Sequence, residues 1–287
     1  MADSVPTGSP ELRAEAPARS PVQAPGLLRD LAIATVFLTR IPVRIPGEVG
    51  GRDIARASRH YPLIGAGVGA CVGGAAWLAM TVFPPVLAAT LACVLGLMLT
   101  GAFHEDALAD VADGFGGGFT VDRKLTIMKD SLHGTYGVLA LVMAMLVRVQ
   151  AIALLPSGLV VAALVATHAL SRVGPVWLMR LLPVARAEGL GAEASRIGWL
   201  EPALAALVAF GLALLTLGPI LATFAILVAA LTAMFVGWLS MKQVGGITGD
   251  VLGTAQQLAE LGILLVVGAL ITHAPALGGG FAATGGG

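Results

Sequence analysis

The sequence predicts an all-α fold, a polytopic bundle of transmembrane helices with about seven spans. Hydrophobic residues make up 57% of the 287 positions and charged residues only 12%, whereas roughly a quarter of the residues in soluble domains are charged. The mean hydropathy is +0.89. These values indicate that lipid, and not water, is the main solvent of the folded chain.

The apolar residues fall into seven stretches that are long enough, or nearly so, to cross a bilayer, which takes about 20 residues per helix. The short turns Pro84-Pro85, Pro156-Ser157 and Gly218-Pro219 separate three pairs of these stretches. Because proline and glycine break helices, each turn predicts an antiparallel return. We expect the spans at residues 62–83, 86–103, 136–155, 158–182, 202–217, 219–240 and 258–272.

A shorter apolar segment, residues 27–39, begins with Arg29 and Asp30 and predicts an interfacial or half-inserted helix. The sequence before it is rich in proline, alanine and serine, and the last residues are rich in glycine. We therefore expect a single transmembrane domain over residues 27–273, between a disordered tail at 1–26 and a flexible tail at 274–287.

Lysine and arginine lie on one side of the predicted bundle, because the three tight turns contain none. By the positive-inside rule that side is cytoplasmic, so we expect a multi-pass protein of the cell membrane with a cytoplasmic working face. The scattered basic residues do not form the clustered face of a nucleic-acid-binding protein. Membrane lipid is an expected partner, and the sequence leaves a homo-oligomer open.

Three polar residues, Arg148, His168 and Arg172, fall within predicted spans. His168 and Arg172 are four residues apart and share one helix face. Charge inside a bilayer is costly and usually faces the interior of the bundle. Two interpretations have equal weight: contact with an anionic group, or a structural pair near a helix end.

An acidic segment at the end of the second span is the strongest indication of a functional site. Residues 104–114 contain Glu105, Asp106, Asp110 and Asp113 without a balancing lysine or arginine. If the helix continues, the three aspartates lie within about 60° on one face and Glu105 points elsewhere. Such carboxylates repel one another unless a cation is present. Mg²⁺ takes one or two carboxylates together with phosphate oxygens and waters, so we predict a Mg²⁺ site, with a solvated acidic helix end as the alternative.

Phosphate-binding features surround this segment. Gly114, Gly116, Gly117 and Gly118 follow it directly, and a backbone without side chains can donate N–H groups to phosphate oxygens. Lys129, further on, can hold a phosphate as a point charge.

A second glycine-rich segment, residues 245–250, contains Thr248 and Asp250. It predicts another phosphate or metal contact, or else a turn in which Asp250 caps the last helix.

In this order, these residues resemble the cobalamin synthase (adenosylcobinamide-GDP ribazoletransferase) family. The most specific part is 104–118, followed by Met128-Lys129-Asp130-Ser131 and Gly134-Thr135-Tyr136-Gly137. Residues 37–42, 61–65 and 246–253 also match, so that the resemblance covers about 37–260. Two departures stand out: Ala107 where the family usually has glycine, and Leu132-His133 where a pair often includes arginine.

The resemblance implies a Mg²⁺-dependent transferase of the last steps of cobalamin biosynthesis. Adenosylcobinamide-GDP and α-ribazole, or α-ribazole 5′-phosphate, would give adenosylcobalamin, or its 5′-phosphate, and GMP. Phosphoryl transfer depends mainly on charge neutralisation and positioning, which the acidic and glycine-rich segments can supply.

Each candidate residue then receives a hypothetical role. Asp106 and Asp110 would coordinate Mg²⁺ with Glu105 close by, and Asp113 would complete the site or act as general base. Lys129 and the backbone of residues 114–118 would hold the pyrophosphate. Thr248 and Asp250 would close the opposite side, with further substrate contacts from His104, Asp130, Ser131 and Arg172.

Two other classes are alternatives. Asp110, Asp113 and Gly114 begin like the motif of CDP-alcohol phosphotransferases, but Phe115-Gly116-Gly117-Gly118 replaces the Ala-Arg pair that should follow. A cation-coupled transporter would place its acids at mid-membrane and often shows repeated halves, whereas these acids lie at span ends.

Overall fold

The computed structural model describes residues 26–185 and 197–273, and this part of the chain is all-α, with one isolated β-bridge between Val184 and Ile247. Both predicted tails and the basic residues Arg186 and Arg196 lie outside the described residues. The helices are α1 (Leu27–Leu38), α2 (Gly51–Ala57), η1 (Ser58–His60), α3 (Tyr61–Ala79), α4 (Pro85–Thr100), α5 (Phe103–Gly117), α6 (Val121–Ile127), α7 (Thr135–Ala153), α8 (Ser157–Leu170), α9 (Val173–Leu181), α11 (Leu200–Val244) and α12 (Gly249–His273).

Five of the described helical stretches are long and apolar enough to cross a membrane. They are the run from α2 through α3, then α7, the α8–α9 pair, α11 and α12; the bent pair α4–α5 would add a sixth. The predicted all-α polytopic bundle is thus confirmed.

The longest helix, α11, contains a break at the position that the sequence predicts. Gly218 has φ +73° and ψ 171°, which is outside the helical region. Ala206 and Phe210 from the first arm line the same cavity as Ala229 and Ala233 from the second. The two arms therefore return side by side, as expected for the spans at 202–217 and 219–240.

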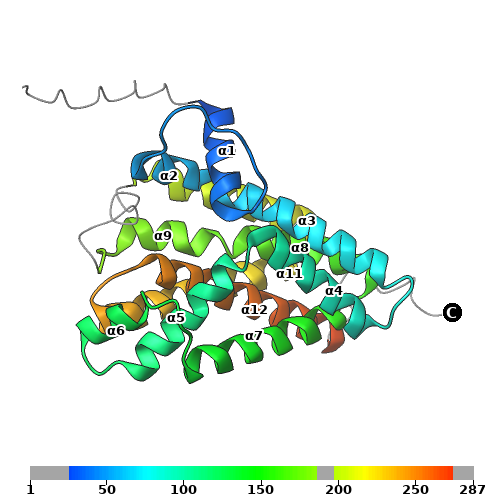
Figure 1. Ribbon diagram of the computed structural model, residues 1–287. Coiled ribbons are helices and arrows are strands. Elements are labelled where there is room, and N and C mark those ends of the chain that lie inside the picture. The colour runs from blue at the N-terminus through cyan, green and yellow to red at the C-terminus, as the bar shows by residue number, and fades with distance from the viewer. Residues whose placement is uncertain (1–25, 186–196, 274–287) are drawn as a thin grey trace, which may run out of the picture.

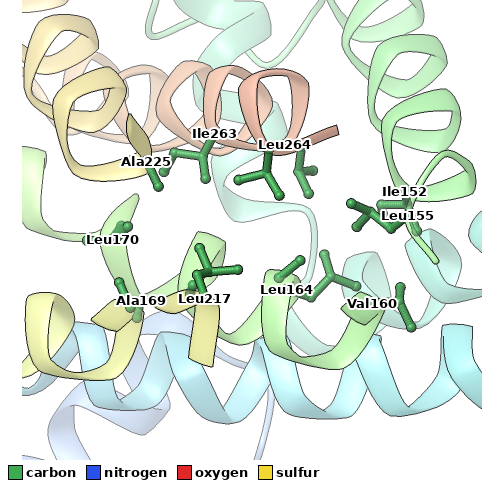
Figure 2. Packing of buried hydrophobic residues seen from close by; sticks show 14 of the residues in the cluster. Ile152, Leu155, Val160, Leu164, Ala169, Leu170, Leu217, Ala225, Ile263 and Leu264 are labelled. Atoms are coloured by element: carbon green, nitrogen blue, oxygen red, sulfur yellow. The ribbon is translucent and has the colours of Figure 1, made fainter. Parts of the chain in front are cut away.

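The core is built around α8, which contacts α3 most extensively. A Cβ on Gly65 or Gly69 would overlap the α8 backbone, and one on Gly73 would lie 2.8 Å from Val161 Cα. Small residues at this spacing let two membrane helices approach closely. On the other side of α8, an apolar cluster joins it to α7, α11 and α12 (Figure 2), with Ile152, Leu164, Leu217, Ala225, Ile263 and Leu264 all buried.

The predicted N-terminal helix is present as α1, and a buried ion pair holds it to its neighbours. The carboxylate of Asp30 is fully buried and lies 2.9 Å from Arg56 and 2.6 Å from Arg59. Whether α1 lies at a membrane interface stays a prediction.

A sharp bend separates the second apolar helix from the acidic one. Gly101 and Ala102 have φ values of +67° and +55°, and the axes of α4 and α5 differ by 90°. The acidic segment is therefore its own helix and not a continuation of the span. Figure 1 shows α5 and α6 at the end of the bundle where α7 and α12 begin.

Candidate active site

The acidic helix α5 is packed between α7 and α12. Its contact with α12 is close, because a Cβ on Gly253 would lie 2.5 Å from Ala107 Cβ, and the Thr254 hydroxyl donates to the Ala107 carbonyl at 3.1 Å. Burial of this side leaves the opposite face of α5 toward solvent, so the four acids of the segment occupy different environments.

The outer face of α5 forms the candidate metal site. Asp106 Oδ1 lies 3.4 Å from Nε2 of His133, and Asp110 Oδ1 lies 3.7 Å from its Nδ1. One atom from each of these three residues can be chosen so that all lie within 4.8 Å of one another. The Asp106 side chain is 64% exposed and that of Asp110 13%. The predicted pairing of Asp106 with Asp110 is therefore present, and a third candidate ligand comes from the α6–α7 loop.

The electrostatic setting of Asp110 fits cation binding. This residue lies outside the five spanning stretches. Burial, followed by the neighbouring charges of Asp106 and Asp250, raises the pKa of Asp110 to about 6. A bound cation would relieve this repulsion. Asp250, in the first turn of α12, is close enough to Asp110 to contribute to this repulsion.

Asp113, predicted as a metal ligand or general base, has a different environment. Its Oδ2 accepts from the Gly134 amide at 2.6 Å and its Oδ1 from the Gly137 amide at 2.9 Å. It thus satisfies N–H groups at the start of α7 that no helical carbonyl reaches. Asp113 therefore caps the start of α7, and it is not one of the three residues whose ligand atoms lie within 4.8 Å of one another. Its role as metal ligand or general base stays a prediction.

Glu105 is also separate from the metal cluster. It points into the bundle, where Oε1 accepts from Arg148 Nη1 at 2.7 Å and from Gln257 Nε2 at 3.1 Å. The sequence expectation that Glu105 points away from the aspartates is met, but its predicted nearness to the metal is not. A buried guanidinium provides its counter-charge instead.

A buried polar network extends from this pair. Glu260 Oε1 lies 3.2 Å from Arg148, and its Oε2 lies 3.3 Å from His168 Nδ1. Arg172 Nη1 donates to the His168 carbonyl at 2.7 Å. These side chains and His104 line a cavity of about 20 Å³, which is large enough for one water molecule.

This network favours the second of the two interpretations of Arg172. Its side chain is buried and bonded to His168, as the structural pair requires. His104 is buried beside it. Both side chains are enclosed, and the substrate contacts predicted for Arg172 and His104 stay predictions.

The glycine segment ends α5 as a helical turn and not as an open loop. Gly114 and Gly116 lie within α5, and the Gly118 amide donates to the Gly114 carbonyl at 3.1 Å. A Cβ on Gly114 would lie 2.5 Å from Met128 Cγ, and one on Gly116 would lie 2.8 Å from the Tyr136 ring. These glycines, with Gly117 at the end of the helix, permit close packing; phosphate binding by their amides stays a prediction.

The remaining predicted contacts lie in loops near the same end. Lys129, Asp130 and Ser131 are exposed in the α6–α7 loop, which also carries His133. The Thr248 hydroxyl accepts from the Val251 amide at 3.2 Å, so Thr248 caps α12, in the role that the sequence suggested for Asp250. The substrate roles of these loop residues stay predictions.

Two residues of these clusters were missed at the sequence level. His133 was read only as a departure from a family pattern, because nothing in its spacing links it to Asp106. Glu260 lies within the predicted span at 258–272, and an acid inside an apolar stretch is itself a signal. It would have indicated the partner of Arg148 and His168.

Fold and site together define a polytopic membrane protein with an acidic cluster suited to a divalent cation. A sequence model of the family described as Cobalamin-5-phosphate synthase matches residues 30–268. The chain belongs to this family, and it is a transferase of cobalamin biosynthesis.

Similar proteins named adenosylcobinamide-GDP ribazoletransferase occur in several bacteria. The one from Bradyrhizobium diazoefficiens is 40% identical over 250 residues, which is 85% of this chain and 94% of the relative. The one from Ralstonia nicotianae is 43% identical over 83% of this chain and 94% of the relative. The one from Leptothrix cholodnii is 42% identical over 81% and 92%. No solved structure matches.

Proposed function

We propose that the chain joins adenosylcobinamide-GDP to α-ribazole, or to α-ribazole 5′-phosphate, in a Mg²⁺-dependent reaction. A ribose hydroxyl would form a bond to the phosphorus that stays with cobinamide, while the bond to the phosphate of GMP breaks. The products would be adenosylcobalamin, or its 5′-phosphate, with GMP and the proton of the hydroxyl. The names of the similar proteins support the first substrate.

The observation that carries this proposal is the cluster of Asp106, Asp110 and His133 at the solvent-facing end of the bundle. Two carboxylates with room for phosphate oxygens and waters are what Mg²⁺ uses in phosphate-transferring sites. When bound, Mg²⁺ would neutralise charge on the phosphate oxygens. Asp106 and Asp110 would hold it, and His133 would lie beside it without a main share in Mg²⁺ binding.

Other residues of the chain would position the pyrophosphate. Lys129 is exposed in the same loop as His133 and would hold a phosphate as a point charge. Asp113 would act indirectly, because it fixes Gly134 and thereby the end of that loop. Asp250 would face the cluster from α12.

We further propose that the reaction takes place on the cytoplasmic face of the cell membrane. Lys124 Nζ donates to Gln243 Oε1 at 2.5 Å, so α6 meets the end of α11 at the active-site end of the bundle. Lys124 and the neighbouring Lys242 therefore lie at this end, while the turns at the opposite ends of the spans contain no lysine or arginine. This distribution follows the positive-inside rule.

The test is release of GMP from adenosylcobinamide-GDP and α-ribazole by purified, folded protein. Asp106→Asn and Asp110→Asn should each lower turnover by about 10²-fold or more, as loss of transition-state charge stabilisation does. Asp122→Asn, an exposed acid on α6, is the matched control and should retain activity. Near-normal turnover of both Asp106→Asn and Asp110→Asn would contradict the assignment of the active site to this cluster.

A further inference from the structure

A second cavity, of about 520 Å³, lies between α9 and the two arms of α11. Its walls are apolar and include Trp177, Phe210, Ala230, Met234 and Trp238. It opens outward, because Met234 and Trp238 remain 68% and 52% exposed. Its volume is within the range of cavities that bind small molecules, and none of its lining residues belongs to the candidate active site.

The helix contacts show how α9 and the second arm of α11 run along this cavity. A Cβ on Gly174 would lie 2.9 Å from Ala233 Cβ, and one on Gly237 would lie 2.7 Å from Leu178 Cδ2. Thus α9 and the second arm of α11 run parallel. The wall from Ile226 to Trp238 is about 18 Å long at 1.5 Å per residue. This length is close to half of a bilayer core of about 30 Å.

One end of the cavity carries aromatic and basic side chains. The rings of Trp177 and Trp199 are 6.3 Å apart, and the guanidinium of Arg180 lies 4.1 Å from the centre of the Trp199 ring. Lys242 Nζ lies 4.3 Å from the centre of the Trp238 ring. Because tryptophan is enriched at membrane–water interfaces, this end marks the level of lipid headgroups.

We propose that the cavity binds one acyl chain of an anionic phospholipid, whose headgroup phosphate is held by Arg180 and Lys242. The apolar walls match a hydrocarbon chain, their length matches one leaflet, and the two cations stack on tryptophan rings at one end of the cavity. The occupant is available to any chain that spans a bilayer. The proposal is independent of the proposed function, because it uses none of the residues around Asp106 and Asp110.

The proposal can be tested on the purified full chain after removal of lipid. Phosphatidylglycerol or phosphatidylcholine with the same acyl chains would be added, and bound lipid would be counted by native mass spectrometry. We expect one tightly retained phosphatidylglycerol, bound at least 10-fold more tightly than phosphatidylcholine. Equal retention of the two lipids overturns the proposal.

Two kinds of variant locate the site. Ala230→Phe fills the cavity from its exposed wall and should abolish retention, whereas Leu231→Phe, on the outer surface one residue further, should not. If either variant is unstable, substitution of the two basic residues provides the second test. Arg180→Gln with Lys242→Gln should bring the two lipids to equal affinity, and Arg123→Gln on α6 should leave the preference unchanged.

The same measurements address a second copy of the chain as the occupant. A dimer that excludes lipid and dissociates in Ala230→Phe would overturn the proposal. So would phosphatidylglycerol binding by Ala230→Phe that equals binding by Leu231→Phe.

Discussion

Arg148 on α7 donates a hydrogen bond to Glu105 on α5 at 2.7 Å, and both side chains are buried. This ion pair fixes the rotation of α5 about its own axis. Successive helical residues are separated by about 100°, so an inward Glu105 turns Asp106 outward toward His133. The buried pair therefore determines which carboxylates can meet a cation.

Replacement of Glu105 by glutamine should destabilise the protein, because it leaves Arg148 with less counter-charge inside the bundle. Breaking a buried ion pair typically costs about 3–5 kcal/mol. The cost should be smaller here, because Glu260 still provides a counter-charge to Arg148. Thermal unfolding in detergent should show a clearly lower midpoint for Glu105→Gln. Glu48→Gln, an exposed acid before α2, is the control and should leave the midpoint within error. Equal midpoints for the two variants would show that the pair does not hold α5.

The helices were predictable because their signals are local. Apolar stretches of span length and the turn at Gly218-Pro219 depend on neighbouring residues alone, and both appear in the structure. The acidic segment was likewise recognisable from four acids without basic neighbours. Its division into separate roles was not predictable, because the partners come from other helices. Asp113 meets Gly134, and Glu105 meets Arg148, 43 residues away.

The α4–α5 bend illustrates another limit. Gly101 offers a left-handed conformation, but Ala102 adopts one as well, and this is uncommon for residues with a side chain. Packing of α5 between α7 and α12 must offset that local cost. A periodicity argument that extends the second span through His104 cannot anticipate such compensation.

Asp113→Asn should reduce stability while leaving metal binding intact. The substitution replaces one acceptor oxygen by a donor, which then faces an amide of Gly134 or Gly137. Loss of a capping interaction costs about 1–2 kcal/mol. Thermal unfolding and Mg²⁺ titration should therefore separate Asp113→Asn, which lowers the midpoint, from Asp110→Asn, which weakens Mg²⁺ binding. A large loss of Mg²⁺ affinity in Asp113→Asn, without a lower midpoint, would return Asp113 to the metal site.

His133→Ala should change metal preference more than Mg²⁺ affinity. Imidazole is a good ligand for Ni²⁺, whereas Mg²⁺ selects oxygen ligands. Loss of His133 should thus weaken Ni²⁺ binding by about 10-fold or more and leave Mg²⁺ binding, which depends on Asp106 and Asp110, nearly unchanged. Isothermal titration with each ion would measure this. His273→Ala, on the C-terminal end of α12, is the control. Equal Ni²⁺ affinities for the unaltered protein and His133→Ala would show that His133 is not a metal ligand.

Gly218→Ala should destabilise the turn between the two arms of α11. A Cβ at Gly218 would have no atom within 4 Å, so any cost arises from the backbone and not from crowding. With φ at +73° and ψ at 171°, the backbone is in a region that is almost confined to glycine, where a residue with a Cβ loses about 1–3 kcal/mol. Gly211→Ala is the matched control, because Gly211 also has open space around it but has an ordinary helical backbone. That change should be neutral or stabilising by up to about 1 kcal/mol. The thermal unfolding midpoints of the two variants should therefore shift in opposite directions, or by clearly different amounts. An unchanged midpoint for Gly218→Ala would mean that the two arms are not held in register by this turn.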